Sequence, residues 1–171
     1  KNSTKTGPRP NWLILNEISA TLWPQNPGAP SLSIYRQWVV DAVTRLHDTY
    51  GYTVVTYAPF ATVGTGSPSN AASWQALAAK SYVGVENYLS GQEVMNGGTD
   101  YASRVAWAKA QYQASKNTYT ADGVPFSELF LGEHFGNTAS GTAYGRAGIS
   151  ASDWDTVIQI RQDAIRAVGF P

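Results

Sequence analysis

Short apolar runs alternate along the chain with longer segments whose apolar residues recur at helical spacing. The runs have the length and the aliphatic and aromatic content of buried β-strands, and they occupy Trp12–Leu15, Thr53–Tyr57, Ser81–Val85 and Glu128–Gly132. The longer segments predict helices over about residues 34–50, 71–80 and 101–118, and from Ser150 or Ser152 to a stop at Gly169. The pattern is one of strand and helix in strict alternation.

Two of the predicted helices carry a clear apolar face. In the first helix its members are Tyr35, Trp38, Val39, Ala42, Val43 and Leu46. In the third helix they are Tyr101, Val105, Ala108 and Tyr112. The glycine-rich stretch before residue 101 is predicted to be a loop.

Strict alternation of buried strands with helices predicts right-handed βα units and a parallel sheet, hence an α/β fold. Two architectures fit: an open, doubly wound sheet, or part of a (β/α)8 TIM barrel, of which a complete example needs about 250 residues. With 171 residues and four βα units, the chain would supply about half of a barrel. Residues 1–10 are polar and proline-rich, and we expect an extended lead-in there, with the four βα units over residues 11–171.

Composition excludes several classes of protein. A hydrophobic fraction of 43% argues against intrinsic disorder, and no apolar run approaches the roughly 18 residues that a membrane helix requires. Twelve basic and twelve acidic side chains give a net charge of zero, without the positive excess of a nucleic-acid-binding protein. The absence of cysteine excludes disulfides and thiolate chemistry.

The chain is poor in charge and rich in aromatic residues. Only 14% of its residues are charged, whereas six tryptophans and ten tyrosines raise the aromatic fraction to 12%. Flat aromatic faces and neutral hydrogen-bonding groups suit sugars and are typical of secreted proteins that handle them, although the same residues also serve in ordinary cores. No signal-peptide pattern is present, so for a secreted protein we expect the signal to have been removed.

Polar residues follow each predicted strand, and three of the four strands are followed by a glutamate: Glu17, Glu86 and Glu133. The carboxyl ends of parallel strands meet at one edge of the sheet, where α/β proteins place their active sites. Two facing carboxyl groups, one protonated and one ionised, are what glycoside hydrolysis requires. A glutamate in this position can also cap the next helix or pair with an arginine.

Other chemistries find little support in the sequence. His47 lies among charged residues of the first predicted helix, where we expect a surface position. A serine triad would have to use His134, yet no G-x-S-x-G motif is present. Neither histidine spacing for a metal nor a complete phosphate-binding or dinucleotide motif is found, so we expect no metal and no cofactor.

The sequence Leu13–Glu17, which ends in Asn16 and Glu17, resembles the fourth strand of the large clan of retaining (β/α)8 glycosidases. In that clan an Asn-Glu pair closes the fourth strand, and a second glutamate at the end of the seventh strand is the nucleophile. The sequence Leu129–Glu133, three βα units further on, occupies the place of that seventh strand.

The resemblance implies a retaining double displacement, with Glu133 as nucleophile, Glu17 as acid/base and Asn16 in contact with the sugar hydroxyl next to the anomeric carbon. Further substrate-binding residues are expected among the polar and aromatic residues around the strand ends, namely Trp23, Tyr57, Glu86, Asn87, Tyr88 and His134. Glu86 stands where the clan more often has a tyrosine or a histidine, so it could bind substrate or rival Glu133 as the nucleophile.

The resemblance covers strands four to seven, and half a barrel leaves two sheet edges and an apolar interior uncovered. A carbohydrate substrate and a complementary polypeptide supplying the remaining strands are therefore the expected partners, with neither nucleic acid nor membrane. Two alternatives remain open: a noncatalytic carbohydrate-binding or assembly module with barrel architecture, and an open-sheet α/β domain of unrelated function. Divergence of Glu17 from Glu133, or pairing of either with an arginine such as Arg36, would favour the noncatalytic module.

Overall fold

The computed structural model of the chain describes residues 11–16, 18, 30–59, 68–87, 89–121, 123–125, 129–132 and 149–170. Over these residues strands alternate with helices in the order β1 (Trp12–Leu15), α1 (Pro30–Asp48), β2 (Thr53–Pro59), α2 (Pro68–Ala78), β3 (Tyr82–Glu86), α3 (Gly91–Asn96), α4 (Tyr101–Ala121), β4 (Leu129–Gly132) and α5 (Ala151–Val168). Strands and helices alternate as predicted, except that two helices, α3 and α4, lie between β3 and β4.

The four described strands form one parallel sheet in the order β1-β2-β3-β4. Leu15 of β1 lies opposite Thr56 of β2, and Glu86 of β3 is level with Pro59 on one side and Gly132 on the other. The order in space is the order in the sequence, without the reversal that defines a doubly wound sheet. Within the described residues the sheet is open, with β1 and β4 at its edges.

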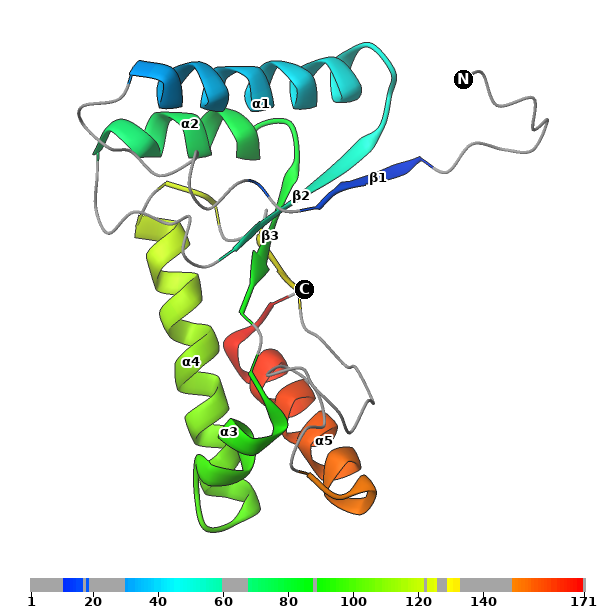
Figure 1. The fold of residues 1–171 in the computed structure, drawn as a ribbon, viewed down its shortest axis with the longest axis vertical. Helices are drawn as coiled ribbons and strands as arrows, with labels where there is room; N and C mark the ends of the chain where they lie inside the picture. Colours follow the sequence, from blue (N-terminus) through cyan, green and yellow to red (C-terminus); the bar gives the residue numbers. More distant parts are fainter. Residues whose placement is uncertain are drawn as a thin grey trace, which may run out of the picture.

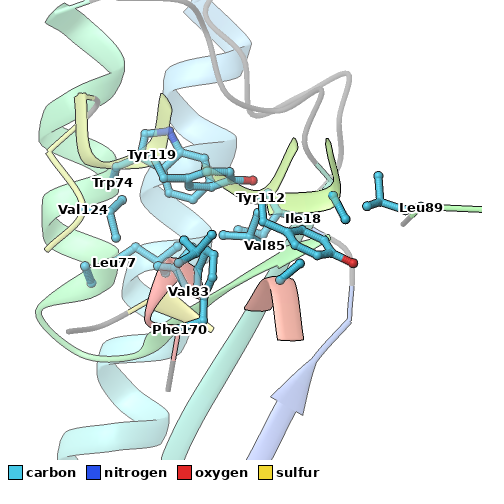
Figure 2. Close-up of a cluster of buried hydrophobic side chains, with 14 of the residues drawn as sticks. Ile18, Trp74, Leu77, Val83, Val85, Leu89, Tyr112, Tyr119, Val124 and Phe170 are labelled. Carbon is cyan, nitrogen blue, oxygen red and sulfur yellow. The ribbon is translucent and has the colours of Figure 1, made fainter. Parts of the chain in front are cut away.

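One face of the sheet packs against the helices. Val54, Val83 and Val85 of β2 and β3 belong to a single buried cluster that also takes side chains from every described helix. Figure 2 shows Val83 and Val85 within this cluster. Its fully buried helical members are Val43, Trp74, Leu77, Val94, Ala108, Tyr112, Tyr119, Val157, Ile160 and Ala164. The core therefore lies between this face of the sheet and one layer of helices.

The helices lie along the sheet in sequence order. Figure 1 shows α1 beside α2 and α4 beside α5, and these pairs are in extensive contact. Trp74 of α2 and Tyr119 of α4 join the two pairs, with their rings edge to face and the centroids 5.4 Å apart. The described helices thus cover one face of an open parallel sheet, whereas a doubly wound sheet has helices on both faces.

The opposite face of the sheet is open at β1. Trp12 and Ile14 are 53% and 59% exposed, and Trp12 stacks on Tyr82 of β3 with ring centroids 5.9 Å apart. The expectation that β1 is a buried strand is therefore wrong for Trp12 and Ile14. Because the described helices all pack on the other face, alternate side chains of this edge strand meet solvent.

The short helix α3 corrects the prediction of a loop before residue 101. Ser90 is its N-cap: the Ser90 side chain accepts a hydrogen bond from Glu93 N, and the Glu93 carboxylate accepts one from Ser90 N at 2.8 Å. This S-x-x-E capping box is itself a signal for a helix start, and the neighbouring glycines concealed it. The described chain thus has five helices where four were predicted.

Two aromatic residues assigned to buried helix faces are exposed instead. Trp38 is 67% exposed, because it lies on a different side of α1 from Val43, which is fully buried. Tyr101 is 41% exposed at the start of α4, where its hydroxyl bonds to Asp163 of α5. His47 is exposed, as expected.

The ends of α5 match the sequence signals. Ser150 is the N-cap and accepts a hydrogen bond from Asp153 N, while Gly169 ends the helix in the left-handed region with a φ of 83°. No helix among the described residues combines the length and the apolar character needed to cross a membrane.

Candidate functional site

The carboxyl ends of the strands lie at one edge of the sheet. Ile18 N donates a 2.8 Å hydrogen bond to Tyr57 O, so the chain that leaves β1 runs beside the end of β2. Glu86 ends β3 level with Pro59 and Gly132. Parallel pairing therefore brings together the strand ends on which the sequence analysis placed the site.

Asn16 and Asn87 occupy different surroundings at this edge. Asn16 is exposed directly after β1, where its amide is accessible to a ligand. Asn87 follows β3 and is half-buried against α4: its Nδ2 donates to Ser115 Oγ at 2.6 Å and to Gln111 O at 3.3 Å. The amide of Asn87, a predicted substrate ligand, thus holds the end of β3 onto a helix.

Tyr57 lies across the neighbouring strand. It is in register with Gly84 of β3, and a Cβ atom added to Gly84 would come within 2.4 Å of the Tyr57 ring. The ring therefore rests on the backbone of Gly84, while Tyr57 remains partly exposed. Gly84 was not among the predicted site residues, although a glycine inside a predicted strand is a recognised sign of close approach.

Five of the predicted site residues lie outside the described residues: Glu17, Trp23, Tyr88, Glu133 and His134. The roles assigned to them, and the separation of the two catalytic carboxyl groups, stay predictions. Of the remaining predicted residues, the structure brings Asn16, Tyr57, Glu86 and Asn87 to the same edge of the sheet.

A polar cavity of about 480 Å³ lies at the opposite edge, lined by the first residues of β2 and β3 and by His47 and Lys80. Asp48 sits between these two groups, with its Oδ1 2.6 Å from His47 Nδ1 and 2.9 Å from Lys80 Nζ. Hydrogen bonds from His47 and Lys80 hold the pKa of the Asp48 carboxyl below its usual value. Asp48 is thus already engaged by Lys80 and His47 at this edge.

Two arginines are buried in the helix layer. Arg36 of α1 is almost fully buried, and burial lowers its pKa. Arg161 of α5 is fully buried, with its guanidinium carbon 5.2 Å from the centre of the Trp154 ring. The cation over an aromatic face makes Arg161 a part of the packing of α5.

Among the described residues, no three histidine, aspartate or glutamate side chains are grouped so that they could hold a metal ion. At the carboxyl edge of the sheet, the described side chains include the amides of Asn16 and Asn87 and the phenol of Tyr57. Comparison with known proteins finds no match to the chain among protein families, curated proteins or solved structures.

Proposed function

We propose that the chain is the catalytic wall of a retaining glycoside hydrolase, with Glu17 as acid/base and Glu133 as nucleophile. The observation that carries the proposal is the parallel sheet in sequential order, whose four carboxyl ends, including Asn16 and Glu86, lie along one edge. In the sequence an Asn-Glu pair follows directly after β1 and a glutamate directly after β4, and glycoside hydrolysis requires two such carboxyl groups.

In the proposed reaction, the Glu133 carboxylate attacks the anomeric carbon while the bond to the leaving oxygen breaks, and Glu17 gives its proton to that oxygen. Glu17, now ionised, then takes a proton from a water molecule, whose oxygen attacks the anomeric carbon and releases Glu133 as a carboxylate. Two inversions at the same carbon retain its configuration. Asn16 contacts the hydroxyl next to the anomeric carbon, beside the acid/base.

The reaction requires a curved sheet. In a flat sheet three strand spacings would hold β1 and β4 about 14 Å apart. Retaining glycosidases need their two carboxyl groups about 5–5.5 Å apart. Curvature toward the face without described helices brings the two edge strands closer, and a closed (β/α)8 barrel supplies that curvature.

A complementary polypeptide with the remaining strands is therefore part of the proposal. The exposure of Trp12 and Ile14 supports it, because parallel sheets are normally buried on both faces. In the closed barrel these two side chains become part of its packed interior, and the sugar binds at the carboxyl ends of the strands.

The test is hydrolysis of nitrophenyl glycosides by the protein purified together with the complementary polypeptide that closes the barrel. Glu17→Gln should lower kcat by about 10²- to 10⁴-fold through loss of the general acid. Glu133→Gly should abolish turnover, and added azide should restore it with formation of a glycosyl azide of inverted configuration. Asp41→Asn, a change at an exposed carboxylate of α1, is the control and should retain full activity. Full activity in either glutamate variant would refute the assignment.

One observation favours a second function, that of a noncatalytic carbohydrate-binding module. The exposed Trp12 and the Tyr82 ring stacked on it form a flat aromatic surface on the open face of the sheet. Rings of this kind bind the apolar faces of sugars. If this function is correct, Trp12→Ala weakens retention on polysaccharide gels, whereas substitution of Glu17 or Glu133 has no effect.

A further inference from the structure

The contact between Tyr57 and Gly84 sets the orientation of an aromatic ring beside the proposed catalytic edge. The three ring atoms Cδ1, Cε1 and Cγ would all lie within 2.8 Å of a Cβ atom on Gly84. Such an approach is possible only without a side chain at that position. One side of the Tyr57 ring therefore packs against the backbone of β3 at Gly84.

The position of Tyr57 relates it to the site. Its carbonyl oxygen accepts the hydrogen bond from Ile18 N, directly beyond the position of the proposed acid/base. Gly84 lies two residues before Glu86, the last residue of β3. The ring thus spans two strands whose ends carry candidate substrate-binding residues, and Tyr57 remains partly exposed.

We infer that Gly84 is a positioning residue that lays the Tyr57 ring flat on the sheet, so that the outer side of the ring stacks against a pyranose ring of the substrate. This inference rests on the proposed function for the identity of the ligand. One face of a pyranose ring can expose several C–H groups together, and an aromatic ring held parallel to the sheet offers them a flat apolar surface. Any side chain at residue 84 would push the ring off the sheet and tilt that surface.

The test uses the protein purified with its complementary polypeptide and nitrophenyl gluco-, galacto-, manno- and xylopyranosides in both anomeric forms. Tyr57→Leu and Gly84→Ala should each raise KM about tenfold, the size expected for loss of one aromatic contact, with kcat changed much less. Tyr57→Phe keeps the ring and should leave KM within about twofold of the native value. Gly84→Ala should have no further effect in a Tyr57→Leu background, because Gly84 acts only through the ring.

Two structural readouts accompany the kinetics. Ring-current shifts of the Gly84 Hα protons should be present in the native protein and in Tyr57→Phe and absent in Tyr57→Leu. Circular dichroism checks that each variant is folded. Should Gly84→Ala fail to fold, recovery of the fold in the double variant would show that the clash with Tyr57 was the cause.

The outcomes separate this inference from the proposed function. If a pyranoside is hydrolysed but KM does not change in Tyr57→Leu and Gly84→Ala, the inference is overturned and the proposed function stands. If nothing is hydrolysed, the proposed function fails, and saturation-transfer NMR with the same pyranosides decides the inference. Signals that are present with the native protein and lost in both variants support it, and their absence from the native protein overturns it.

Discussion

Asn87 connects the end of β3 to the middle of α4 through one short side-chain contact. Its amide nitrogen lies 2.6 Å from Ser115 Oγ, and Ser115 is fully buried. An intramolecular hydrogen bond contributes about 0.5–1.5 kcal/mol, so Asn87 stabilises the fold through its bonds to Ser115 Oγ and Gln111 O. The same contact fixes the backbone that follows Glu86 at the proposed site.

Replacement of Asn87 should therefore reduce stability before it affects substrate binding. We expect Asn87→Ala to lower the free energy of unfolding in urea by about 1–2 kcal/mol, because the two hydrogen bonds to α4 are lost. Asn117→Ala, at an exposed asparagine of the same helix whose Oδ1 accepts from Gln113, should change it by less than about 0.5 kcal/mol. A large rise in KM without a loss of stability in Asn87→Ala would instead identify Asn87 as a substrate ligand.

At the scale of elements, α4 and α5 form the most extensive helix contact in the described chain. Tyr101 at the start of α4 donates a 2.7 Å hydrogen bond from its hydroxyl to Asp163 Oδ2 in the middle of α5. Hydrogen bonds from Tyr101 and Gln159, together with the charge of Arg166, lower the pKa of Asp163, and the bond to Asp163 raises the pKa of Tyr101. Both shifts favour an ionised Asp163 beside a neutral Tyr101.

The two pKa shifts predict how this bond depends on pH. A lowered carboxyl pKa stabilises the folded protein above the ordinary aspartate value of about 3.9, and this contribution is lost as the pH falls through the lowered pKa. The raised tyrosine pKa stabilises the folded protein at pH values below the ordinary tyrosine pKa of about 10. This contribution is lost as the pH rises through the raised pKa. The hydrogen bond between the helices is therefore fully formed between these two limits.

Tyr101→Phe tests the acid limit. Its loss of stability relative to the native chain, measured by urea unfolding, should be larger at pH 7 than at pH 3 (conditions that lie on either side of about 3.9, the ordinary aspartate pKa). Tyr50→Phe, at another exposed tyrosine whose ring lies against Arg45, should show the same small effect at both pH values. An effect of Tyr101→Phe that grows on acidification would contradict the assigned direction.

The strands were predictable from the sequence for a simple physical reason. Thr53–Pro59 and Tyr82–Glu86 are short, rich in β-branched residues and bounded by polar or glycine residues, and burial on the helix face enforces that pattern. The helix α3 was not recognised, because its capping box stands among glycines that also suit a loop. The exposure of Trp38 depended on which side of α1 meets the sheet, and periodicity alone does not specify tertiary contacts.

The candidate site was predictable in position but not in contacts. A parallel sheet places residues after the strands at one edge, so the sequence located Asn16, Glu86 and Asn87 together. It did not reveal that Asn87 turns to α4, because that contact joins residues 28 positions apart in the sequence. The contact between the Tyr57 ring and the backbone of Gly84 depends on the register of β2 against β3, which no local sequence pattern specifies.

At the scale of the whole molecule, the two faces of the sheet differ in a way that bears on its partners. The helix layer covers one face, whereas Trp12 and Ile14 leave an apolar area exposed on the other. Toward the amino ends of the strands, the described side chains on that second face (Trp12, Ile14, Thr53, Val55 and Tyr82) carry no charge. An apolar face beside an unpaired parallel edge strand is suited to another β-layer, as a barrel would provide.

A charge placed on this face should therefore prevent association. We expect the native protein to show a mass above the 18.4 kDa of one chain in native mass spectrometry, and Ile14→Lys to reduce it to the single chain, because burial of an unpaired lysine is costly. Ile34→Lys makes the same change at an isoleucine that is 50% exposed on α1, compared with 59% for Ile14, so it controls for charge and for loss of the side chain. Ile34→Lys should leave the association intact.

A native protein that is already a single chain would contradict the barrel proposal. Equal dissociation by both variants would place the interface elsewhere than on the open face of the sheet.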